Sequence, residues 1–299
     1  MSMITDICSM YILLAAATTL EIQATIDFLE DTVSRPGGQE TALLITGVGS
    51  VAATYALARR IGDRRPDLII QAGIAGCFSQ SKPGSTVSAG PTISAGAPTA
   101  AGAATAFGST IPGTTVPDAT VVTVRPTIPG ATVTVGPTVA GSVVAIGSTV
   151  AVSEELLADL GVWEEGGFRT LFDLNLAGKD SPPFTGGALI NPYQRILALS
   201  GLEQVRGITV NEITTSRQRL EWYQQNLQPV VESMEGGALH YVCLRENIPF
   251  IQIRSVSNDA GERDKTKWNI GAAIRQLNDE LIALLTRLAA ADGSVLEAG

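Results

Sequence analysis

The sequence predicts a globular α/β domain, and three observations support that prediction. Short apolar runs that are typical of buried strands alternate along the chain with amphipathic helices. Glycine-rich turns follow two of the predicted strands, which is common where a strand ends beside a ligand. A long amphipathic helix closes the chain. With 299 residues, 45% of them hydrophobic and 16% charged, the chain is long enough to bury a sizeable core.

Composition excludes several classes of function. A net charge of −9 and a pI near 4.7 argue against a nucleic-acid partner, because such binding depends on neutralising phosphates. Cys8, Cys77 and Cys243 are odd in number and lack metal-ligand spacing, so neither a disulfide framework nor a metal site is expected. No cofactor is expected either. The apolar run at residues 10 to 17 is too short to cross a bilayer. We therefore expect a cytoplasmic protein with no membrane partner.

The first predicted elements are a strand at residues 11 to 17 and a helix that follows it. The helix has one apolar stripe, made of Ile22, Ile26, Leu29 and Val33. Thr18 and Glu21 have the spacing of a capping box, in which Thr18 caps the helix and Glu21 reaches back to the Thr18 amide. A purely structural role for Glu21 is therefore expected from the local pattern.

A second strand is predicted at residues 42 to 46, and it leads through a Gly-x-Gly turn into a helix that runs to about residue 61. This turn, Gly47-Val-Gly49, is similar to a dinucleotide-binding fingerprint. Asp67 lies near the position where a ribose-binding acid would be expected. A Rossmann-type oxidoreductase is therefore one alternative, although the turn follows the second strand rather than the first.

A third strand is predicted at residues 68 to 72, and it ends in Gly73-Ile74-Ala75-Gly76, in which every residue but Ile74 is small. Small residues at the carboxyl end of a strand let a ligand approach the backbone closely. The alternative is a tight turn packed beneath a loop. Cys77 is interpreted as a small apolar filler rather than a nucleophile.

The composition changes sharply between residues 84 and 146. Between residues 85 and 146 only Asp118 and Arg125 are charged, and glycines recur every six residues at 84, 90, 96, 102 and 108. This period is typical of β-solenoid rungs, and low complexity is equally typical of a poorly ordered segment. The Gly-Ser-Thr-Val run at residue 84 recurs at residue 147. We therefore predict an insertion over residues 84 to 146 within a discontinuous domain, residues 1 to 83 and 147 to 299, and some β structure between residues 120 and 150.

The rest of the chain continues the α/β alternation. Strands are predicted at residues 205 to 210 and 248 to 253, and helices at residues 219 to 225 and 267 to 290. Three loop aromatics, Phe168, Phe172 and Phe184, are either anchors of the loop or borders of an aromatic ligand. The only histidine, His240, is predicted to lie mid-helix, which disfavours a His-based triad or metal site.

Polar groups gather at both ends of the stretch from residue 231 to residue 258. Glu235 opens a predicted helix, and the run from Arg254 to Asn258 leaves a predicted strand. Groups at such positions can converge on one polar ligand. The alternative is that Glu235 only complements the helix dipole and that Arg254 is solvated.

The motifs of this stretch resemble a known superfamily. Residues 234 to 238 (Met-Glu-Gly-Gly-Ala), 253 to 258 (Ile-Arg-Ser-Val-Ser-Asn) and 263 to 264 (Arg-Asp) resemble the nucleoside phosphorylases and nucleosidases, and most closely the futalosine hydrolases. The resemblance covers residues 10 to 83 and 147 to 290. It implies a three-layer α/β/α sandwich, a homodimer or higher homo-oligomer, and cleavage of the N-glycosidic bond of a nucleoside in menaquinone biosynthesis.

The resemblance also implies roles for individual residues. Glu21 would orient and deprotonate the attacking water, Glu235 would hold the ribose hydroxyls, and Met234 would pack against the sugar. The segment Ile74, Ala75 and Gly76 would line the ribose and base pocket.

At the base end the resemblance implies a role for Asn258, oriented by Ser257 and Arg254. Family members that act on 6-aminopurines carry an Asp at the position of Asn258. An amide cannot release a proton but can donate a hydrogen bond to N7, which suits a 6-oxopurine such as hypoxanthine. Three alternatives stay open: a methylthioadenosine/adenosylhomocysteine nucleosidase, a purine nucleoside phosphorylase, and a non-catalytic nucleoside-binding scaffold that self-associates through the repeat.

Overall fold

The structure is a computed structural model. It describes residues 10–32, 39–78, 121–124 (backbone only), 144–165, 167–291 and 293–298. The hexapeptide pattern at residues 84 to 108, and with it most of the predicted insertion, lies outside the described residues.

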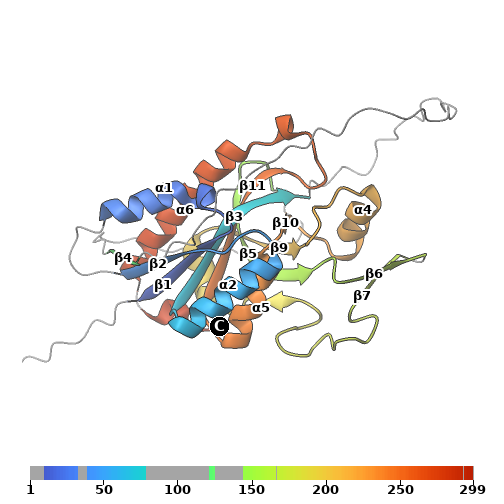
Figure 1. The fold of residues 1–299 in the computed structure, drawn as a ribbon, viewed down its shortest axis with the longest axis horizontal. Coiled ribbons are helices and arrows are strands. Elements are labelled where there is room, and N and C mark those ends of the chain that lie inside the picture. The colour runs from blue at the N-terminus through green and yellow to red at the C-terminus, as the bar shows by residue number, and fades with distance from the viewer. Residues whose placement is uncertain are drawn as a thin grey trace, which may run out of the picture. The chain divides into compact units, whose positions relative to one another are not determined.

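One mixed sheet dominates the fold (Figure 1). Its strands lie in the order β10-β9-β5-β11-β3-β1-β2-β4, and β8 pairs with β5 beside this path. A separate hairpin is formed by β6 and β7. The strands are β1 (Tyr11–Ala16), β2 (Gln39–Ile45), β3 (Leu68–Cys77), β4 (Val121–Val124), β5 (Thr149–Leu157), β6 (Gly161–Glu164), β7 (Gly167–Thr170), β8 (Leu189–Ile190), β9 (Glu203–Thr209), β10 (Val231–Ser233) and β11 (Phe250–Asp259).

The pairing of the strands brings several strand ends together. Strands β2, β1, β3 and β11 are parallel neighbours, and β5 runs antiparallel to β11. Strand β10 pairs both with β9 and with β3, so that β3, β11, β5, β9 and β10 close into a ring. The carboxyl ends of β3 and β11 therefore lie side by side.

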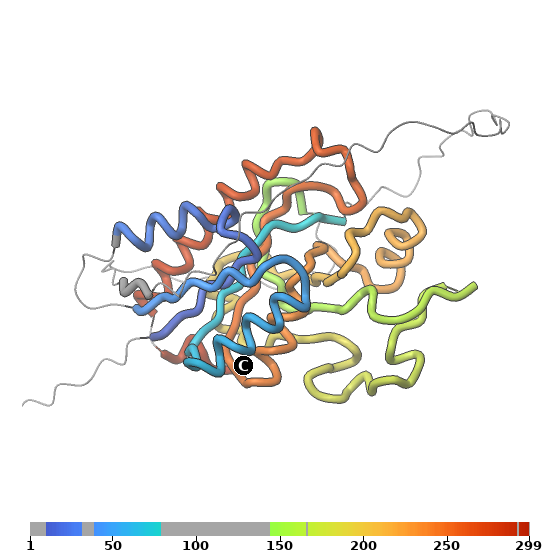
Figure 2. The backbone as a smooth tube through the Cα atoms, viewed as in Figure 1, coloured from blue at the N-terminus to red at the C-terminus, as the bar shows by residue number. Residues whose placement is uncertain are grey.

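Helices cover both faces of this sheet. Figures 1 and 2 show α1 and α6 together on one face and α2 and α5 together on the other. The helices are α1 (Thr19–Thr32), α2 (Ser50–Asp63), α3 (Gln194–Ser200), α4 (Arg217–Asn226), α5 (Gly236–Glu246) and α6 (Ile270–Ala290), with short 3-10 turns η1 (Lys265–Lys267) and η2 (Gly293–Leu296). The three-layer α/β/α architecture that was predicted is therefore confirmed.

The core lies between the sheet and these helices. Every residue of β1 is buried, because a parallel strand covered on both faces has no solvated side. Helix α6 contributes an apolar face to this core, and its buried members are Ala273, Leu277, Leu281, Leu284, Leu285 and Leu288. One polar residue, Asn278, is buried in the same face.

Two strands are longer than predicted. The segment from Gly73 to Gly76 continues β3 as far as Cys77, and β11 continues to Asp259. The two extensions pair in parallel, from Arg254 opposite Gly73 onwards, with an irregularity between Val256 and Asn258. The tight-turn alternative for this segment is wrong, because a neighbouring strand supplies the partners that a glycine-rich sequence alone does not predict.

The predicted β structure between residues 120 and 150 is present at β4, which pairs antiparallel with β2. The closing helix begins later than predicted. Residues 265 to 267 form the 3-10 turn η1, and α6 starts at Ile270 with the Asn269 side chain accepting from the Ala272 amide.

Candidate active site

Glu21 lies in the first turn of α1, where it makes contacts of two kinds. Its Oε2 accepts from the amide of Thr18 at 3.0 Å and from the Thr18 hydroxyl at 2.9 Å. Its Oε1 accepts from the Ile74 amide of β3 at 3.2 Å. The predicted contact with the Thr18 amide is therefore present, but the same carboxylate also reaches the strand that was predicted to line a pocket.

Glu235 is the N-cap residue of α5, yet its side chain does not cap that helix. The side chain is buried, and its Oε1 accepts from the amide of Gly49 at 2.9 Å. Gly49 is the N-cap of α2 and has a φ of 95°, which favours glycine. A carboxylate of the same chain thus occupies the helix start that would bind a pyrophosphate in a Rossmann fold.

Asp67 does not take part in this site. Its Oδ2 accepts from the amide of Tyr11 at 2.7 Å, where β1 begins. Asp67 precedes β3, so it lies at the amino ends of these parallel strands, whereas ligands of open α/β sheets bind at the carboxyl ends. The structure therefore contradicts the dinucleotide-binding alternative. Glu235 occupies the expected phosphate site, and Asp67 lies at the opposite ends of the strands from a bound ligand.

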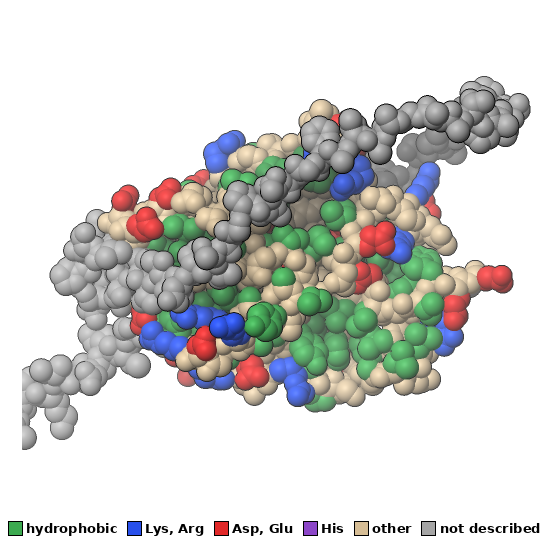
Figure 3. Space-filling view, in the orientation of Figure 1, with side chains coloured by type: hydrophobic (Ala, Val, Ile, Leu, Met, Phe, Trp, Pro, Cys, Tyr) green, Lys and Arg blue, Asp and Glu red, His purple; other side chains and the backbone are tan. Residues whose placement is uncertain are grey.

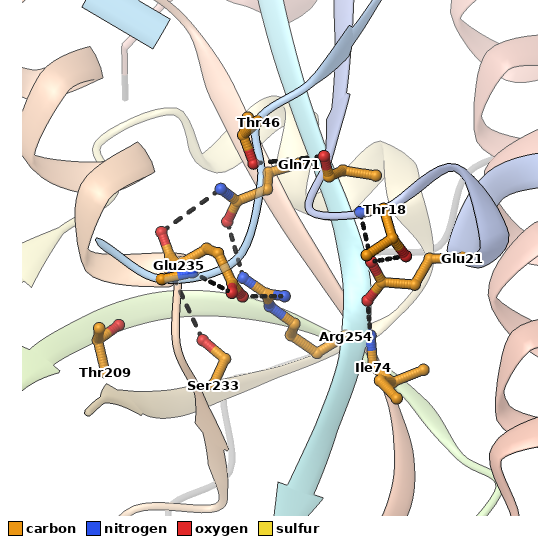
Figure 4. A network of polar contacts seen from close by, with 12 residues as sticks. Thr18, Glu21, Thr46, Gln71, Ile74, Thr209, Ser233, Glu235 and Arg254 are labelled. Atoms are coloured by element: carbon orange, nitrogen blue, oxygen red, sulfur yellow. Dashed lines mark hydrogen bonds and ion pairs between the residues drawn. The ribbon is translucent and has the colours of Figure 1, made fainter. Parts of the chain in front are cut away.

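Arg254 joins Glu235 to β3 (Figure 4). Its Nη2 donates to Oε1 of Gln71 at 2.8 Å, and its Nη1 lies 3.6 Å from Oε2 of Glu235. Gln71 in turn donates to the backbone carbonyl of Glu235 at 3.4 Å. Arg254 is only 1% exposed, so its interpretation as a solvated residue at a strand end is wrong. A buried guanidinium needs such partners, because an unpaired charge is costly in the interior.

Gly73 connects the two halves of this arrangement. A Cβ placed on Gly73 would clash with Nη1 of Arg254 and would lie 3.1 Å from Oε1 of Glu21. Glu21 and Arg254 therefore approach the same glycine, and Arg254 reaches Glu235. Two carboxylates that are distant in the sequence thus lie around the carboxyl half of β3.

Asn258 lies further along the same pair of strands, opposite Gly76. Its Oδ1 accepts from the Ser257 hydroxyl at 2.7 Å, and its Nδ2 donates to the Asp259 carbonyl at 2.8 Å. Ser257 also lies 3.2 Å from the carbonyl oxygen of Ala75. The structure places Asn258 two residues along β3 from Ile74, which contacts Glu21. Asn258, Ile74, Gly76 and Met234 are all partly exposed.

Comparison with known proteins gives a consistent picture. No protein-family model matches this sequence. The chain is 30% identical over 133 residues to a futalosine hydrolase of Acidothermus cellulolyticus, and the match covers 42% of this chain and about half (52%) of that relative. A 5′-methylthioadenosine/S-adenosylhomocysteine nucleosidase of Colwellia psychrerythraea, solved in complex with adenine, superposes with a TM-score of 0.61 at 16% identity, over 94% of this chain and 96% of that one. A futalosine hydrolase of Helicobacter pylori superposes with a TM-score of 0.59 at 13% identity, over 92% and 97%.

This chain has the nucleosidase fold. Each superposition covers more than nine tenths of this chain, so the likeness extends over the whole fold rather than over one part of it.

Several residues of the nucleosidase fold that support the site were not predicted, and Glu155 is the most unusual. Glu155 is fully buried on β5, and burial raises its pKa to about 7. Its Oε1 accepts from the Thr209 hydroxyl at 2.8 Å, and that hydroxyl accepts from the amide of Gly237 at 2.6 Å. A Cβ on Gly236 would lie 2.7 Å from Oε2 of Glu155. The two glycines after Glu235 therefore allow α5 to start directly above a buried carboxyl group.

His240 lies within α5, as predicted, and both His240 and Cys77 are buried. His240 is buried in α5, where its Nδ1 lies 3.0 Å from the Leu189 carbonyl oxygen, and burial lowers its pKa to about 4. Burial raises the pKa of the Cys77 thiol to about 12, so the reactive thiolate is scarce at neutral pH. Within the described part of the chain, no three His, Cys, Asp or Glu residues are grouped as a metal site would require.

The loop aromatics form two packed clusters. Phe168 contacts Trp163 and Trp222, with ring centroids 5.5 and 5.2 Å apart. Phe172 and Phe184 pack edge to face at 5.1 Å. These contacts show that the rings anchor the loop, whereas a role toward a ligand stays a prediction. In the ranges that the structure describes, no helix is both long and apolar enough to cross a membrane.

Proposed function

We propose that this protein is an N-glycosyl hydrolase that cleaves futalosine, releasing hypoxanthine and leaving dehypoxanthine futalosine, a step of menaquinone biosynthesis. The observation that carries the proposal is the meeting of Glu21 and Glu235 around Gly73 and Arg254. The match to a curated futalosine hydrolase supports the substrate, and the nucleosidase fold supports the reaction class.

The geometry suits the charge that develops in this reaction. Cleavage of an N-glycosidic bond builds positive charge on the sugar and negative charge on the departing base. Glu21 is proposed to orient the attacking water and to take its proton. Glu235 is proposed to hold the ribose hydroxyls, and Arg254 fixes the position of its carboxylate.

Base selection is assigned to Asn258. Its amide is held from two sides, by the hydroxyl of Ser257 and by the carbonyl of Asp259. An amide in a fixed orientation can donate to N7 and recognise a purine edge, but it cannot supply a proton. This property suits a 6-oxopurine such as hypoxanthine better than adenine.

Hydrolysis is favoured over phosphorolysis because the groups near the site that could bind a phosphate already have other partners. The amide of Gly49 is taken by Glu235, and Arg254 is buried and engaged by Gln71 and Glu235. Arg59 lies on the exposed side of α2 and donates to the hydroxyl of Tyr55. A phosphate needs an open cationic site, and none of these groups is available to form one.

The experiment is an assay of base release by the purified protein. Hypoxanthine release from futalosine and adenine release from methylthioadenosine are measured with and without phosphate. The proposal predicts phosphate-independent release of hypoxanthine and a preference for futalosine, which Asn258→Asp shifts toward methylthioadenosine. Binding of futalosine without turnover would instead favour the non-catalytic scaffold, and phosphate-dependent release would favour a phosphorylase.

We also propose that the protein is a cytoplasmic homodimer or higher homo-oligomer. Hydrophobic side chains gather on the face shown in Figure 3, beside the helices α2 and α5 and over the loop between β7 and β8. Val51 and Tyr55 of α2 are 81% and 65% exposed, and Tyr241 of α5 is 39% exposed. Exposed apolar surface of this kind is typical of association. Sedimentation of the wild-type protein and of a Val51→Glu variant tests this, with a smaller species expected for the variant.

A further inference from the structure

Asn278 lies on the buried face of α6, and its side chain reaches α1. Its Oδ1 accepts from the Thr25 amide at 2.8 Å and from the Thr25 hydroxyl at 2.7 Å. Its Nδ2 donates to the backbone carbonyl of Glu21 at 2.9 Å and to the carbonyl of Ile274 at 2.7 Å. Both amide hydrogens and both oxygen lone pairs are therefore used, in a side chain that is 2% exposed.

The two groups that Asn278 contacts on α1 form a pair. In a regular α-helix the amide of Thr25 would donate directly to the carbonyl of Glu21, four residues earlier. Asn278 bridges these two groups. Ile22, which lies between them, has φ −122° and ψ 16°, outside the helical region, and α1 is kinked there. Insertion of a side chain into the backbone ladder is a known cause of such a kink.

We propose that Asn278 is a positioning residue for Glu21, which sets the direction of its carboxylate by holding the first turn of α1 in the kinked conformation. This inference rests on the proposed function, in which Glu21 orients water. The first turn is fixed at three points: at the Glu21 carbonyl by Asn278, at Oε2 by Thr18, and at Oε1 by Ile74. Of these three contacts, only the one with Asn278 holds the backbone of Glu21 itself.

Without the Asn278 amide, the start of α1 can become a straight helix instead of a kinked one. Without the bridge, the buried amide of Thr25 needs an acceptor, and the Glu21 carbonyl is the one that a straight helix supplies. Straightening turns the first helical residues and moves the carboxylate away from the Ile74 amide. A displacement of about 1 Å in a catalytic group can cost about 10²-fold in rate.

The test compares three variants of the full chain. Asn278→Leu removes the bridge, and Asn278→Asp, which is nearly isosteric, keeps the acceptor for Thr25 but cannot donate to Glu21. Leu284→Ala, in the same buried face of α6, is the control for general destabilisation. Both Asn278 variants are expected to lower kcat, Asn278→Leu by about 10²-fold with KM changed less than about threefold. The control is expected to keep the wild-type kcat at a temperature where it is folded.

A double-mutant cycle with Glu21→Gln separates positioning from stability. If Asn278 acts through Glu21, Asn278→Leu causes little further loss of kcat once Glu21 is replaced. An equal loss in both backgrounds, or a kcat that matches that of the Leu284→Ala control, would overturn the inference.

A structural readout keeps this inference separate from the proposed function. If the wild-type protein releases no base from futalosine, methylthioadenosine or inosine, the proposed function fails. The crystal structure of Asn278→Leu still decides whether Asn278 holds the kink. Helical angles at Ile22, with the Thr25 amide bonded to the Glu21 carbonyl, are expected, and an unchanged kink would contradict the inference.

Discussion

The starts of α1 and α5 both present a glutamate, but the two carboxylates are held in different ways. Glu21 bonds to Thr18, three residues earlier, and to the strand β3. The Glu235 side chain makes no capping bond to its own helix and accepts from the amide of Gly49, 186 residues away in the sequence. This difference shows that a glutamate can cap its own helix and still take part in a site, because its two carboxylate oxygens can bind different groups. A side chain with no local partner at a helix start, such as that of Glu235, is held by tertiary contacts alone.

Replacing Glu21 should separate the two roles of the α1 start most strongly. Glu21→Gln keeps the shape and a hydrogen-bonding side chain but removes the base, so we expect kcat for hypoxanthine release to fall by about 10³-fold. KM should change little, because the proposed ribose contacts come from Glu235. Steady-state kinetics measure both. Near-normal turnover would show that Glu21 is only a cap.

Replacing Glu155, which is buried beside the start of α5, should show how this carboxyl group makes the stability of the protein depend on pH. In the folded protein burial raises the pKa of Glu155 from 4.5 to about 7, so the wild type loses stability as the pH rises between these values. Glu155→Gln cannot ionise. The free energy of unfolding of the variant, relative to wild type, should therefore increase by roughly 3 kcal/mol from about pH 4.5 to about pH 7.

Urea unfolding at several pH values measures this difference. His240, whose pKa is lowered to about 4, makes the fold lose stability as the pH falls from 6.5, but both proteins retain it, so its effect cancels. Nearby Arg254 favours the ionised form of Glu155, and Glu235 disfavours it. A difference that stays flat with pH would show that the pKa of Glu155 is not raised in the folded protein.

Replacing Gly73 tests the place where Glu21, at the start of α1, and Arg254, which contacts Glu235, come together. In Gly73→Ala the new methyl group clashes with Arg254 and crowds Glu21, so we expect kcat to fall by about 10²-fold and stability by about 1 to 3 kcal/mol. Gly62→Ala in α2 is a matched control, because nothing lies within 4 Å of its new methyl group. Equal activity of the two variants would contradict the close approach of Arg254 and Glu21.

The smallest effect is expected at the local cap itself. Thr18→Val removes the hydroxyl that donates to Glu21 but leaves the Thr18 amide contact in place. We expect a loss of about 1 kcal/mol in the free energy of unfolding, as for one lost hydrogen bond, and a fall in kcat of only a few-fold. Thermal unfolding and the same kinetic assay measure both. A loss as large as that of Glu21→Gln would mean that the cap, rather than the strand contact, positions the carboxylate.

Much of the fold could be predicted because its strands and helices show a local periodicity of apolar residues. The strands β1 and β9 and the helices α1, α2 and α4 lie within a few residues of their predicted ranges. The carboxyl halves of β3 and β11 could not be predicted in the same way. Their glycine-rich or polar sequences have weak strand preference, and only pairing with each other makes them strands.

The candidate site was predicted less completely, for a related reason. Glu21, Glu235 and Asn258 were suggested by motifs, but the burial of Arg254 depends on Gln71, which is 183 residues away in the sequence. Asn278 interrupts the apolar stripe of α6 beside Leu277, which was the one available signal of its role. Glu155 gave no such signal, because its partners Thr209 and Gly237 belong to other elements.

The most direct test is to cleave futalosine in phosphate-free water enriched in ¹⁸O and to follow the label by mass spectrometry. The account predicts one ¹⁸O atom in the sugar product, unlabelled hypoxanthine, and a rate that falls by about 10³-fold in Glu21→Gln. No release of hypoxanthine without phosphate, or release that is unaffected by Glu21→Gln, would contradict it.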